Sequence, residues 1–250
     1  MTLAGAEGRH ATTVRRLAAG ERVDVTDGAG TMAECVVLAG RAGVLELQVL
    51  ERRFEAAPQP RLVVVQAIPK GDRGELAVET MTEVGVDVIV PWSAERCVVR
   101  WRDDRAAKGV ARWRSTAVAA AKQSRRSWFP EVTDVAGTAA VAALVAGAGR
   151  ALLLDPDAKA ALAGLEAPGA RPGDADADGP TGPVTTEDGL PGRGDVVLLV
   201  GPEGGISPQE TELLAGAGAQ GVRLGPTVLR ASSAGAVAAA LVLSAAGRWS

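Results

Sequence analysis

Short, uninterrupted apolar runs are the feature that most constrains how this chain folds. VVLLV at residues 196–200 and LVVVQAI at 62–68 contain at most one polar side chain each, the pattern of a strand that is buried on both faces. After LVVVQAI comes a helical repeat that Gly85 ends, and VDVIV follows at 86–90. The order β, α, β is typical of a parallel sheet that is covered by helices.

The chain beyond residue 60 continues this alternation. We expect further strands at 151–154, 196–200 and 222–224, and helices at about 108–126, 208–217 and 233–246. The expected fold class is therefore α/β, with an open sheet.

The N-terminal part of the chain has a different pattern. ERVDVTD at 21–27, TMAECVVL at 31–38 and GVLELQVL at 43–50 alternate apolar with polar residues, and DGAG at 27–30 is a hairpin turn signal. This predicts a small antiparallel β domain. EAAPQPR at 55–61 contains two prolines and no periodic pattern, so we place the domain boundary there.

Composition excludes several classes of protein. A net charge of −3 argues against a general polyanion binder, and no apolar run approaches the roughly 20 residues that a membrane span needs. The N-terminus, MTLAGAEGRH, lacks the layout of a secretory signal, so we expect a cytoplasmic protein without a membrane partner. Cys35, Cys97 and the single histidine, His10, make no recognisable metal site. We therefore expect no bound metal and two buried thiols.

Charge is distributed unevenly along the chain. Residues 96–126 hold ten Lys or Arg against two Asp, which is typical either of a solvated helix face or of a surface that contacts phosphates. The sequence leaves both interpretations open. In residues 167–194, twelve of 28 are Gly or Pro, and only Val184 and Leu190 are suited to a core. We expect this segment to be a mobile insertion.

The strand at 196–200 runs into VGPEGGISPQE. In open α/β sheets, ligands bind at the carboxyl ends of the strands, and the glycines of GPEGG let a ligand approach the backbone. Ser207, Pro208 and Glu210 have the spacing of a helix N-cap, N1 and N3, a capping box. The free amides of such a helix start favour anionic or carbonyl groups. The alternative is a tight turn that binds nothing.

A second glycine-proline loop follows downstream. LGPTVLRASSAG at 224–235 again comes after a short strand and leads into an alanine-rich helix, which we expect to begin near Ser232 or Ser233. Two such loops at strand ends can wall one pocket. Neither contains the GxxxxGK[ST] phosphate loop or the GxGxxG dinucleotide fingerprint, so the common nucleotide-binding motifs are excluded.

These stretches resemble the RsmE group of the SPOUT methyltransferases, which methylate N3 of a uridine in the 16S RNA of the small ribosomal subunit. GPEGG followed by LGPxxLR is the most specific part of the resemblance. The matching stretches are RHATTVRRLAAGERVDVTDGAG, QAIPKGDRGELAVETMTEVGVDVIVPWSAERCVV, AAKQSRRSWFPEV, VGPEGGISPQE and LGPTVLRASSAGAVAAA.

The resemblance implies a fold and a set of partners. It implies a PUA-like β-barrel that helps to hold RNA at residues 1–57, and a SPOUT α/β domain with a C-terminal trefoil knot at 61–250. It also implies S-adenosylmethionine as cofactor, 16S rRNA of the small ribosomal subunit as partner, and a homodimer.

Carried over by position, the resemblance also assigns residues to roles. The cofactor-binding candidates lie in three loops and are Leu153, Leu154, Val200, Gly201, Pro202, Glu203, Gly204, Gly205, Ile206, Leu224, Gly225, Pro226, Val228, Leu229 and Arg230. The RNA-binding candidates are Arg9, His10, Arg15, Arg16, Lys122, Arg125 and Arg126.

Two of the loop residues are also catalytic candidates. Arg230 stays protonated and is suited to stabilise the negative charge that develops on uridine. Glu203 either accepts a hydrogen bond from a ligand or braces the loop through nearby amides. No residue stands out as a general base. Trp128 and Phe129, next to the basic residues, either stack on bases or pack in a core.

The chain departs from the family pattern in two places. LRASSA stands where the family usually has LRTETA, so Ala231 and Ser232 replace a hydroxyl and a carboxylate, and Ser233 is left to cap the helix. The chain also begins later than family members usually do, so we expect the first barrel strand to be missing. Two other functions stay open: a SPOUT enzyme that acts on another RNA position, and a non-catalytic RNA-binding factor that keeps the fold.

Overall fold

The computed structural model describes residues 1–164, 190 and 194–249. The chain divides into two compact units, one of Met1–Ala57 with Arg126–Trp128 and the other of Pro58–Arg125 with Phe129–Ser250. Arg126–Trp128 thus groups with the N-terminal unit, although the sequence places it inside the domain at 61–250. Of the expected insertion at 167–194, only Leu190 and Gly194 lie within the described residues, and Leu190 is buried in a core.

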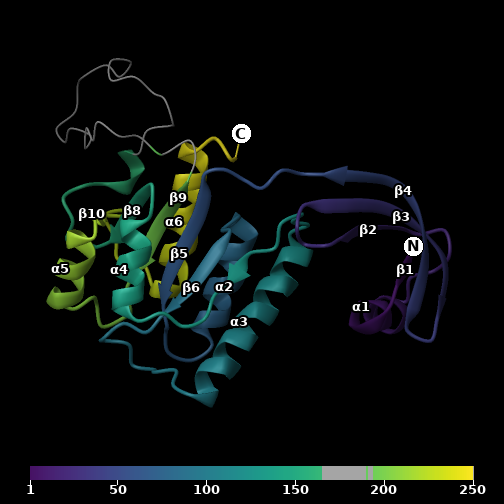
Figure 1. Ribbon diagram of the computed structural model, residues 1–250, viewed down its shortest axis with the longest axis horizontal. Coiled ribbons are helices and arrows are strands. Elements are labelled where there is room, and N and C mark those ends of the chain that lie inside the picture. Colours follow the sequence, from purple (N-terminus) through teal and green to yellow (C-terminus); the bar gives the residue numbers. More distant parts are fainter. Residues whose placement is uncertain (165–189, 191–193, 250) are drawn as a thin grey trace. The chain divides into compact units, whose positions relative to one another are not determined.

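The N-terminal unit is built on a four-stranded antiparallel sheet in the order β1-β4-β3-β2 (Figure 1). A two-residue strand, β1, pairs with β4 and stands before the first strand that the sequence predicted, where we expected none. The elements are β1 (Thr2–Leu3), α1 (Gly5–Arg9), η1 (His10–Val14), β2 (Arg22–Thr26), β3 (Thr31–Arg41) and β4 (Val44–Phe54).

The hairpin between β2 and β3 forms at the predicted DGAG turn. Asp27 Oδ1 accepts hydrogen bonds from the backbone N–H groups of Ala29 (2.7 Å) and Thr31 (3.0 Å), which is how an aspartate side chain closes a turn. A small apolar core then packs against the sheet. It consists of Ala11, Ala33, Cys35, Val37, Leu45 and Leu47.

Trp128 packs inside the N-terminal unit. Its Nε1 donates a hydrogen bond to the carbonyl of Glu55 at 2.9 Å, and its ring meets that of Phe54 edge-on with centroids 6.3 Å apart. A Cβ on Gly30 would lie 2.8 Å from the indole ring, so the indole lies directly against the Gly30 backbone. These contacts favour the packing interpretation of Trp128 over base stacking.

The second unit contains a six-stranded sheet in which every neighbouring pair is parallel (Figure 1). The strand order is β10-β8-β9-β5-β6-β7, so the carboxyl ends of all six strands meet at one edge of the sheet. The strands are β5 (Arg61–Ala67), β6 (Val88–Trp92), β7 (Glu131–Val132), β8 (Arg150–Leu154), β9 (Asp195–Val200) and β10 (Gln220–Val222). The predicted α/β class with a parallel sheet is confirmed.

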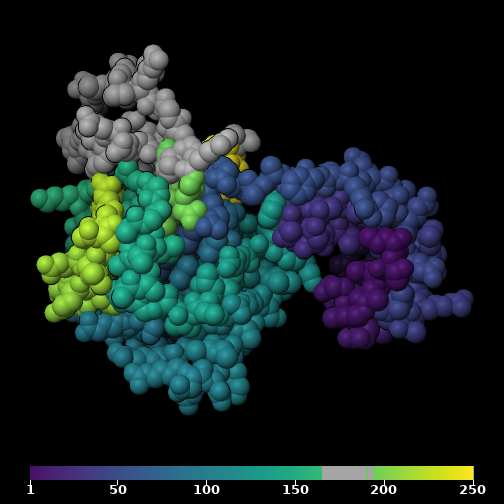
Figure 2. Space-filling model, in the orientation of Figure 1, coloured from purple at the N-terminus to yellow at the C-terminus, as the bar shows by residue number. Residues whose placement is uncertain are grey.

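Helices cover both faces of this sheet, as the apolar runs predict. Along β5, Leu62 and Val64 join a core with α2 (Arg73–Val84), α3 (Asp104–Gln123) and α6 (Ala231–Ala245). The alternate residues, Val63 and Val65, join a second core with α4 and α5. Those two helices, α4 (Thr138–Ala146) and α5 (Pro208–Gly216), lie side by side at the surface, where Figure 2 shows them in teal and yellow-green.

Several elements differ from the sequence-based expectations. The helix expected at 108–126 begins earlier, at Asp104, and the strand expected at 222–224 is β10, which ends at Val222. α4 and β7 were not predicted. The α4 sequence TAAVAALVA is apolar on every side, so it has no amphipathic period to detect, and β7 is only two residues long.

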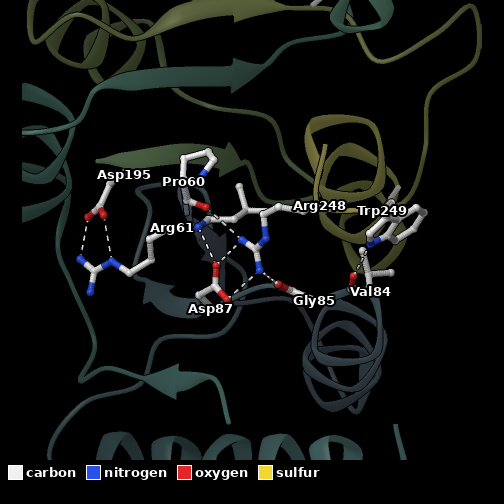
Figure 3. A network of polar contacts seen from close by, with 9 residues as sticks. Pro60, Arg61, Val84, Gly85, Asp87, Asp195, Arg248 and Trp249 are labelled. Carbon is white, nitrogen blue, oxygen red and sulfur yellow. Dashed lines mark hydrogen bonds and ion pairs between the residues drawn. The ribbon is translucent and has the colours of Figure 1, made fainter. Parts of the chain in front are cut away.

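A buried ion pair ties the end of α6 to the start of the sheet (Figure 3). Arg248 donates two hydrogen bonds to the Asp87 carboxylate, at 2.6 and 3.1 Å, and others to the carbonyls of Pro60 and Gly85. Asp87 also accepts from the N–H of Leu62 at 2.8 Å. A bidentate, fully hydrogen-bonded pair of this kind restrains α6, the helix whose other end forms part of the site described next.

Candidate functional site

One pocket opens at the carboxyl ends of β8, β9 and β10. Its volume is about 940 Å³, within the range of small-molecule sites. Three loops wall it: residues 153–157 after β8, residues 200–206 after β9, and residues 223–231 after β10. The two glycine-proline loops therefore do share one pocket.

The GPEGG loop turns sharply before α5. Gly205, at φ +73°, donates its N–H to the carbonyl of Pro202 at 2.9 Å, which closes the turn. At Gly201, a Cβ would come within 2.7 Å of Ile206 Cγ1, so the first glycine allows the two ends of the loop to touch. The predicted capping box is confirmed: Ser207 is the N-cap of α5, Pro208 follows it, and Ser207 and Glu210 exchange hydrogen bonds.

Glu210 does more than cap α5. Its carboxylate is buried and accepts hydrogen bonds from the N–H of Glu95 (2.9 Å) and the hydroxyl of Thr138 (2.7 Å), besides the N–H and hydroxyl of Ser207. Burial alone would raise the pKa of Glu210, but the hydrogen bonds from Thr138, Glu95 and Ser207 outweigh it and hold the pKa below its usual value. The ionised carboxylate thus joins α5, α4 and the loop after β6.

The LGPTVLR loop is held less firmly. Residues 226–230 are all exposed, and Val228 reaches 81% exposure. The expected helix start near Ser232 or Ser233 is wrong, because α6 begins at Ala231 with Arg230 as its N-cap residue and without a side-chain capping bond. Ser233 therefore does not cap the helix. Arg230 instead lies in the pocket wall with its side chain exposed.

Charged side chains line the rim of the pocket, and sequence reasoning missed most of them. Arg73 at the start of α2 lies 3.6 Å from Glu203, and the N–H of Lys70 donates to the same carboxylate at 3.5 Å. These contacts match the bracing role considered for Glu203. Other charged lining residues are Arg96, Asp155, Asp157, Glu212 and Arg223. Arg73 and Arg96 lie far from both loops in sequence, so only their position at strand ends pointed to them.

Most of the predicted cofactor residues lie in this one wall. Leu153 and Leu154 line the pocket from the end of β8, and Val200, Gly201, Pro202, Glu203, Gly205 and Ile206 from β9 and its loop. The third loop contributes Leu224, Gly225, Val228, Leu229 and Arg230. Gly204 and Pro226 are not among the lining residues. Gly204 packs instead against Arg96, whose carbonyl oxygen and Cβ lie 3.2 and 3.3 Å from the place of an added Cβ.

The predicted RNA-binding residues lie outside the pocket wall. Arg9, His10, Arg15 and Arg16 are exposed within a short segment around η1 of the N-terminal unit. Lys122 and Arg125 are exposed at and beyond the last turn of α3, and Arg126 belongs to the N-terminal unit. Their roles stay predictions.

Other kinds of site find little support in the described part of the chain. Residues 1–164, 190 and 194–249 contain no group of three or more His, Cys, Asp or Glu placed to hold a metal ion. Cys35 and Cys97 are both buried, as expected, and burial raises the pKa of each thiol. None of the helices described here combines the length and the apolar character that crossing a bilayer requires.

Comparison with known proteins gives the same answer for both parts of the chain. Residues 56–243 match the RNA methyltransferase domain family, and residues 3–45 match the RNA methyltransferase PUA domain. Ribosomal RNA small subunit methyltransferase E of Mycobacterium tuberculosis is 41% identical over 249 residues, which is 98% of this chain and 86% of that protein. The protein of that name from Bacillus subtilis is 25% identical over 234 residues, covering 93% and 85% of the two chains.

A solved structure extends the comparison to three dimensions. Ribosomal RNA small subunit methyltransferase E from Neisseria gonorrhoeae, bound to S-adenosyl methionine, superposes with a TM-score of 0.77. The identity is 26%, and the match covers 98% of this chain and 92% of that one. The chain therefore belongs to the RNA methyltransferase family and, within it, to the group of ribosomal RNA small subunit methyltransferase E.

Proposed function

We propose that this protein transfers the methyl group of S-adenosylmethionine to N3 of a uridine in the 16S rRNA of the small ribosomal subunit. The observation that carries the proposal is the single pocket walled by the loops after β8, β9 and β10, with GPEGG and LGPTVLR on two of its sides. Family membership and the S-adenosylmethionine bound to the gonococcal relative support the reaction class.

The residues of the pocket fit this cofactor. Leu153, Val228 and Leu229 offer apolar surface for an adenine ring, while the glycines expose backbone N–H and C=O groups for its edges and for the methionine portion. At Gly225 an added Cβ would meet no protein atom within 4 Å, so the backbone there adjoins open space. A glycine lets a bound molecule approach that backbone closely.

The chemistry divides between the cofactor and the protein. When bound, S-adenosylmethionine supplies a methyl group on a sulfonium that is already activated. The protein must position the uracil ring in line with that group and favour the ring that has lost its N3 proton to solvent. The electron pair left on N3 then forms the new N–C bond while the C–S bond breaks toward sulfur. We propose that Arg230 stabilises the negative ring, and that Glu203 mainly braces the loop.

RNA binding, quaternary structure and topology complete the proposal. We propose that residues 1–57 form an RNA-binding domain through Arg9, His10, Arg15 and Arg16, and that Lys122, Arg125 and Arg126 add contacts to phosphates. The domain at 61–250 would contain the trefoil knot and would form a homodimer in the cytoplasm, where ribosomal subunits are its substrate.

The first test is a methylation assay with labelled S-adenosylmethionine and small ribosomal subunits from cells that lack this activity. Digestion of the RNA should release 3-methyluridine from a single site. Label on another nucleoside would identify an enzyme with a different RNA target. Absence of label, with the cofactor still bound in a separate titration, would identify a non-catalytic RNA-binding factor.

A matched pair of glycine variants tests the pocket itself. Gly225→Val places a side chain where the pocket wall is open and should weaken cofactor binding by at least about 10-fold, because the added methyl groups compete with the ligand for space. Gly137→Val is the control, since Gly137 also faces open space but does not line the pocket. Equal affinity for the two variants would refute the placement of the cofactor.

A further inference from the structure

We propose that Arg96 contacts the target uracil and stabilises the negative charge that the ring carries once N3 has lost its proton. This inference rests on the proposed function and adds a substrate-contacting residue to it. Arg96 stands in the loop between β6 and α3, is exposed, and lines the pocket beside GPEGG. The loop motifs of the sequence do not include it.

The backbone around Arg96 is fixed from three directions. The N–H of Glu95 donates to the buried carboxylate of Glu210 at 2.9 Å, and the N–H of Cys97 donates to the carbonyl of Ala94 at 3.1 Å. The carbonyl and Cβ of Arg96 itself pack on Gly204. A guanidinium whose backbone is anchored in this way is preorganised, which is what makes an electrostatic group effective at a reacting centre.

The guanidinium has donors to spare. In the described part of the chain, Arg96 makes one hydrogen bond, from Nη1 to the carbonyl of Gly204 at 3.4 Å, whereas a guanidinium carries five N–H donors. Arg73, across the loop, is instead partly neutralised by Glu203 at 3.6 Å. Arg96 therefore presents a positive charge whose strong hydrogen bonds are still to be made.

The position of Arg96 favours the RNA over the cofactor as the group that it meets. The apolar and backbone groups suited to the cofactor, from Leu153, Val200 and Leu224, are at most half-exposed, whereas Arg96 is exposed at the rim. A base that enters from outside reaches the rim first. Deprotonated uracil spreads its negative charge over N3, O2 and O4, and a guanidinium offers N–H donors to such an oxygen.

The charge balance of the step assigns a definite role to Arg96. Loss of the N3 proton to solvent leaves its electron pair on the ring, and a nearby cation makes that loss more favourable. The charged and titratable groups around Arg96 are Glu95, Cys97 and Arg100 on its own loop, Glu203 on the GPEGG loop, and Glu210 on α5. Glu210 is ionised and bound by four donors, so it acts as a positioning residue for the loop.

The experiment compares Arg96→Gln, Arg96→Lys and Arg100→Gln with the wild-type protein. Arg100 is the matched control, because it lies on the same loop, donates to the carbonyl of Glu95 and does not line the pocket. Single-turnover methylation of small ribosomal subunits is measured between about pH 6 and about pH 10. Cofactor affinity is measured by calorimetry, and thermal unfolding checks that each variant folds.

We expect Arg96→Gln to slow methyl transfer by on the order of 100-fold near neutral pH. The deficit should shrink toward high pH, where the ring loses its proton without help, and Arg96→Lys should recover part of the rate because it keeps the charge. Cofactor affinity should stay within about 3-fold of wild type, and Arg100→Gln should match wild type throughout.

Other results overturn the inference. A deficit of equal size at every pH would assign Arg96 a structural role. A loss of cofactor affinity in proportion to the loss of rate would show that the guanidinium serves the carboxylate of the cofactor instead. Arg96→Gln with wild-type activity would remove this residue while leaving the proposed function intact, whereas a wild-type protein that methylates no uridine removes both.

Discussion

The GPEGG loop at 201–206 and the LGPTVLR loop at 224–230 each connect a parallel strand to a helix, on either side of the strand β8, and each lines the same pocket. The first is cross-braced: Gly205 bonds to Pro202, Glu203 lies near Arg73, and the following helix start is capped. The second is exposed over residues 226–230 and runs into a helix without a side-chain cap. The same residue types thus produce one preformed wall and one wall that has few restraints of its own.

The difference has a functional reading. A preformed wall presents its N–H and C=O groups without an ordering cost at the moment of binding. An exposed wall can yield to admit a ligand and then close on it. We therefore expect the ligand to order the LGPTVLR loop and to leave the GPEGG loop as it is.

Removing Glu210 should damage the braced side most. Glu210→Ala leaves the N–H of Glu95 and the hydroxyl of Thr138 without their buried acceptor, and we expect a loss of about 3 kcal/mol in the free energy of unfolding. Urea unfolding measures this loss. Deletion of the Arg230 side chain, on the exposed loop, should change the same free energy by less than about 0.5 kcal/mol.

The pKa of Glu210 adds a pH dependence to this prediction. Because the folded protein holds this pKa below its ordinary value of 4.5, ionised Glu210 contributes stability that is fully present above that value and is lost as the pH falls through the lower folded value. Glu210→Gln removes the titration. The stability difference between wild type and Glu210→Gln should therefore narrow in acid, and a gap that stays constant down to about pH 3 would contradict the assignment.

Hydrogen exchange tests the two loops in a single sample. At a cofactor concentration about 100 times Kd, amides of residues 227–230 should exchange up to about 100-fold more slowly, because ligand binding opposes local opening. Amides of residues 203–206 should slow by less than about 3-fold, since they are already held. Equal protection of both loops would break the comparison.

The glycines of the two loops give a smaller, steric test. A Cβ at Gly201 would lie 2.7 Å from Ile206 Cγ1, whereas one at Gly225 would meet nothing within 4 Å. We expect Gly201→Ala to cost about 1–2 kcal/mol of stability and Gly225→Ala to stay within about 0.5 kcal/mol of wild type. Chemical unfolding measures both, and the reverse order would show that the first loop has slack that its contacts do not suggest.

Much of the fold and of the pocket could be read from the sequence, because both depend on local patterns. The runs at 62–68 and 196–200 report burial on two faces directly, and Ser207 and Glu210 define a helix start through their spacing alone. Arg96 and the second role of Glu210 could not be read in this way. Each arises where β6 and β9 end at one edge of the sheet, a contact between residues more than a hundred positions apart.

The start of α6 shows a different limit. Ser232 and Ser233 are residues that favour an N-cap, yet the helix begins one position before Ser232, with Arg230 as N-cap. Ser232 is buried and Ser233 is exposed, so the packing of α6 against the sheet decides the boundary and overrides the local preference for a serine cap. The loss of a carboxylate from LRTETA to LRASSA follows the same logic, because a buried position at 232 accepts a small side chain without needing a partner for a charge.

The smallest expected effect tests this boundary directly. Ser207 accepts a hydrogen bond from the N–H of Glu210 at the start of α5, so Ser207→Ala should cost about 1 kcal/mol, the usual value of an N-cap. Ser233→Ala should cost less than about 0.5 kcal/mol, because Ser233 caps nothing at the start of α6 and its side chain is exposed. Thermal unfolding of the two single variants and of the double variant separates these values. If Ser233→Ala proved as costly as Ser207→Ala, α6 in solution would begin at a serine cap, and the LGPTVLR loop would be longer and better anchored than its exposed residues indicate.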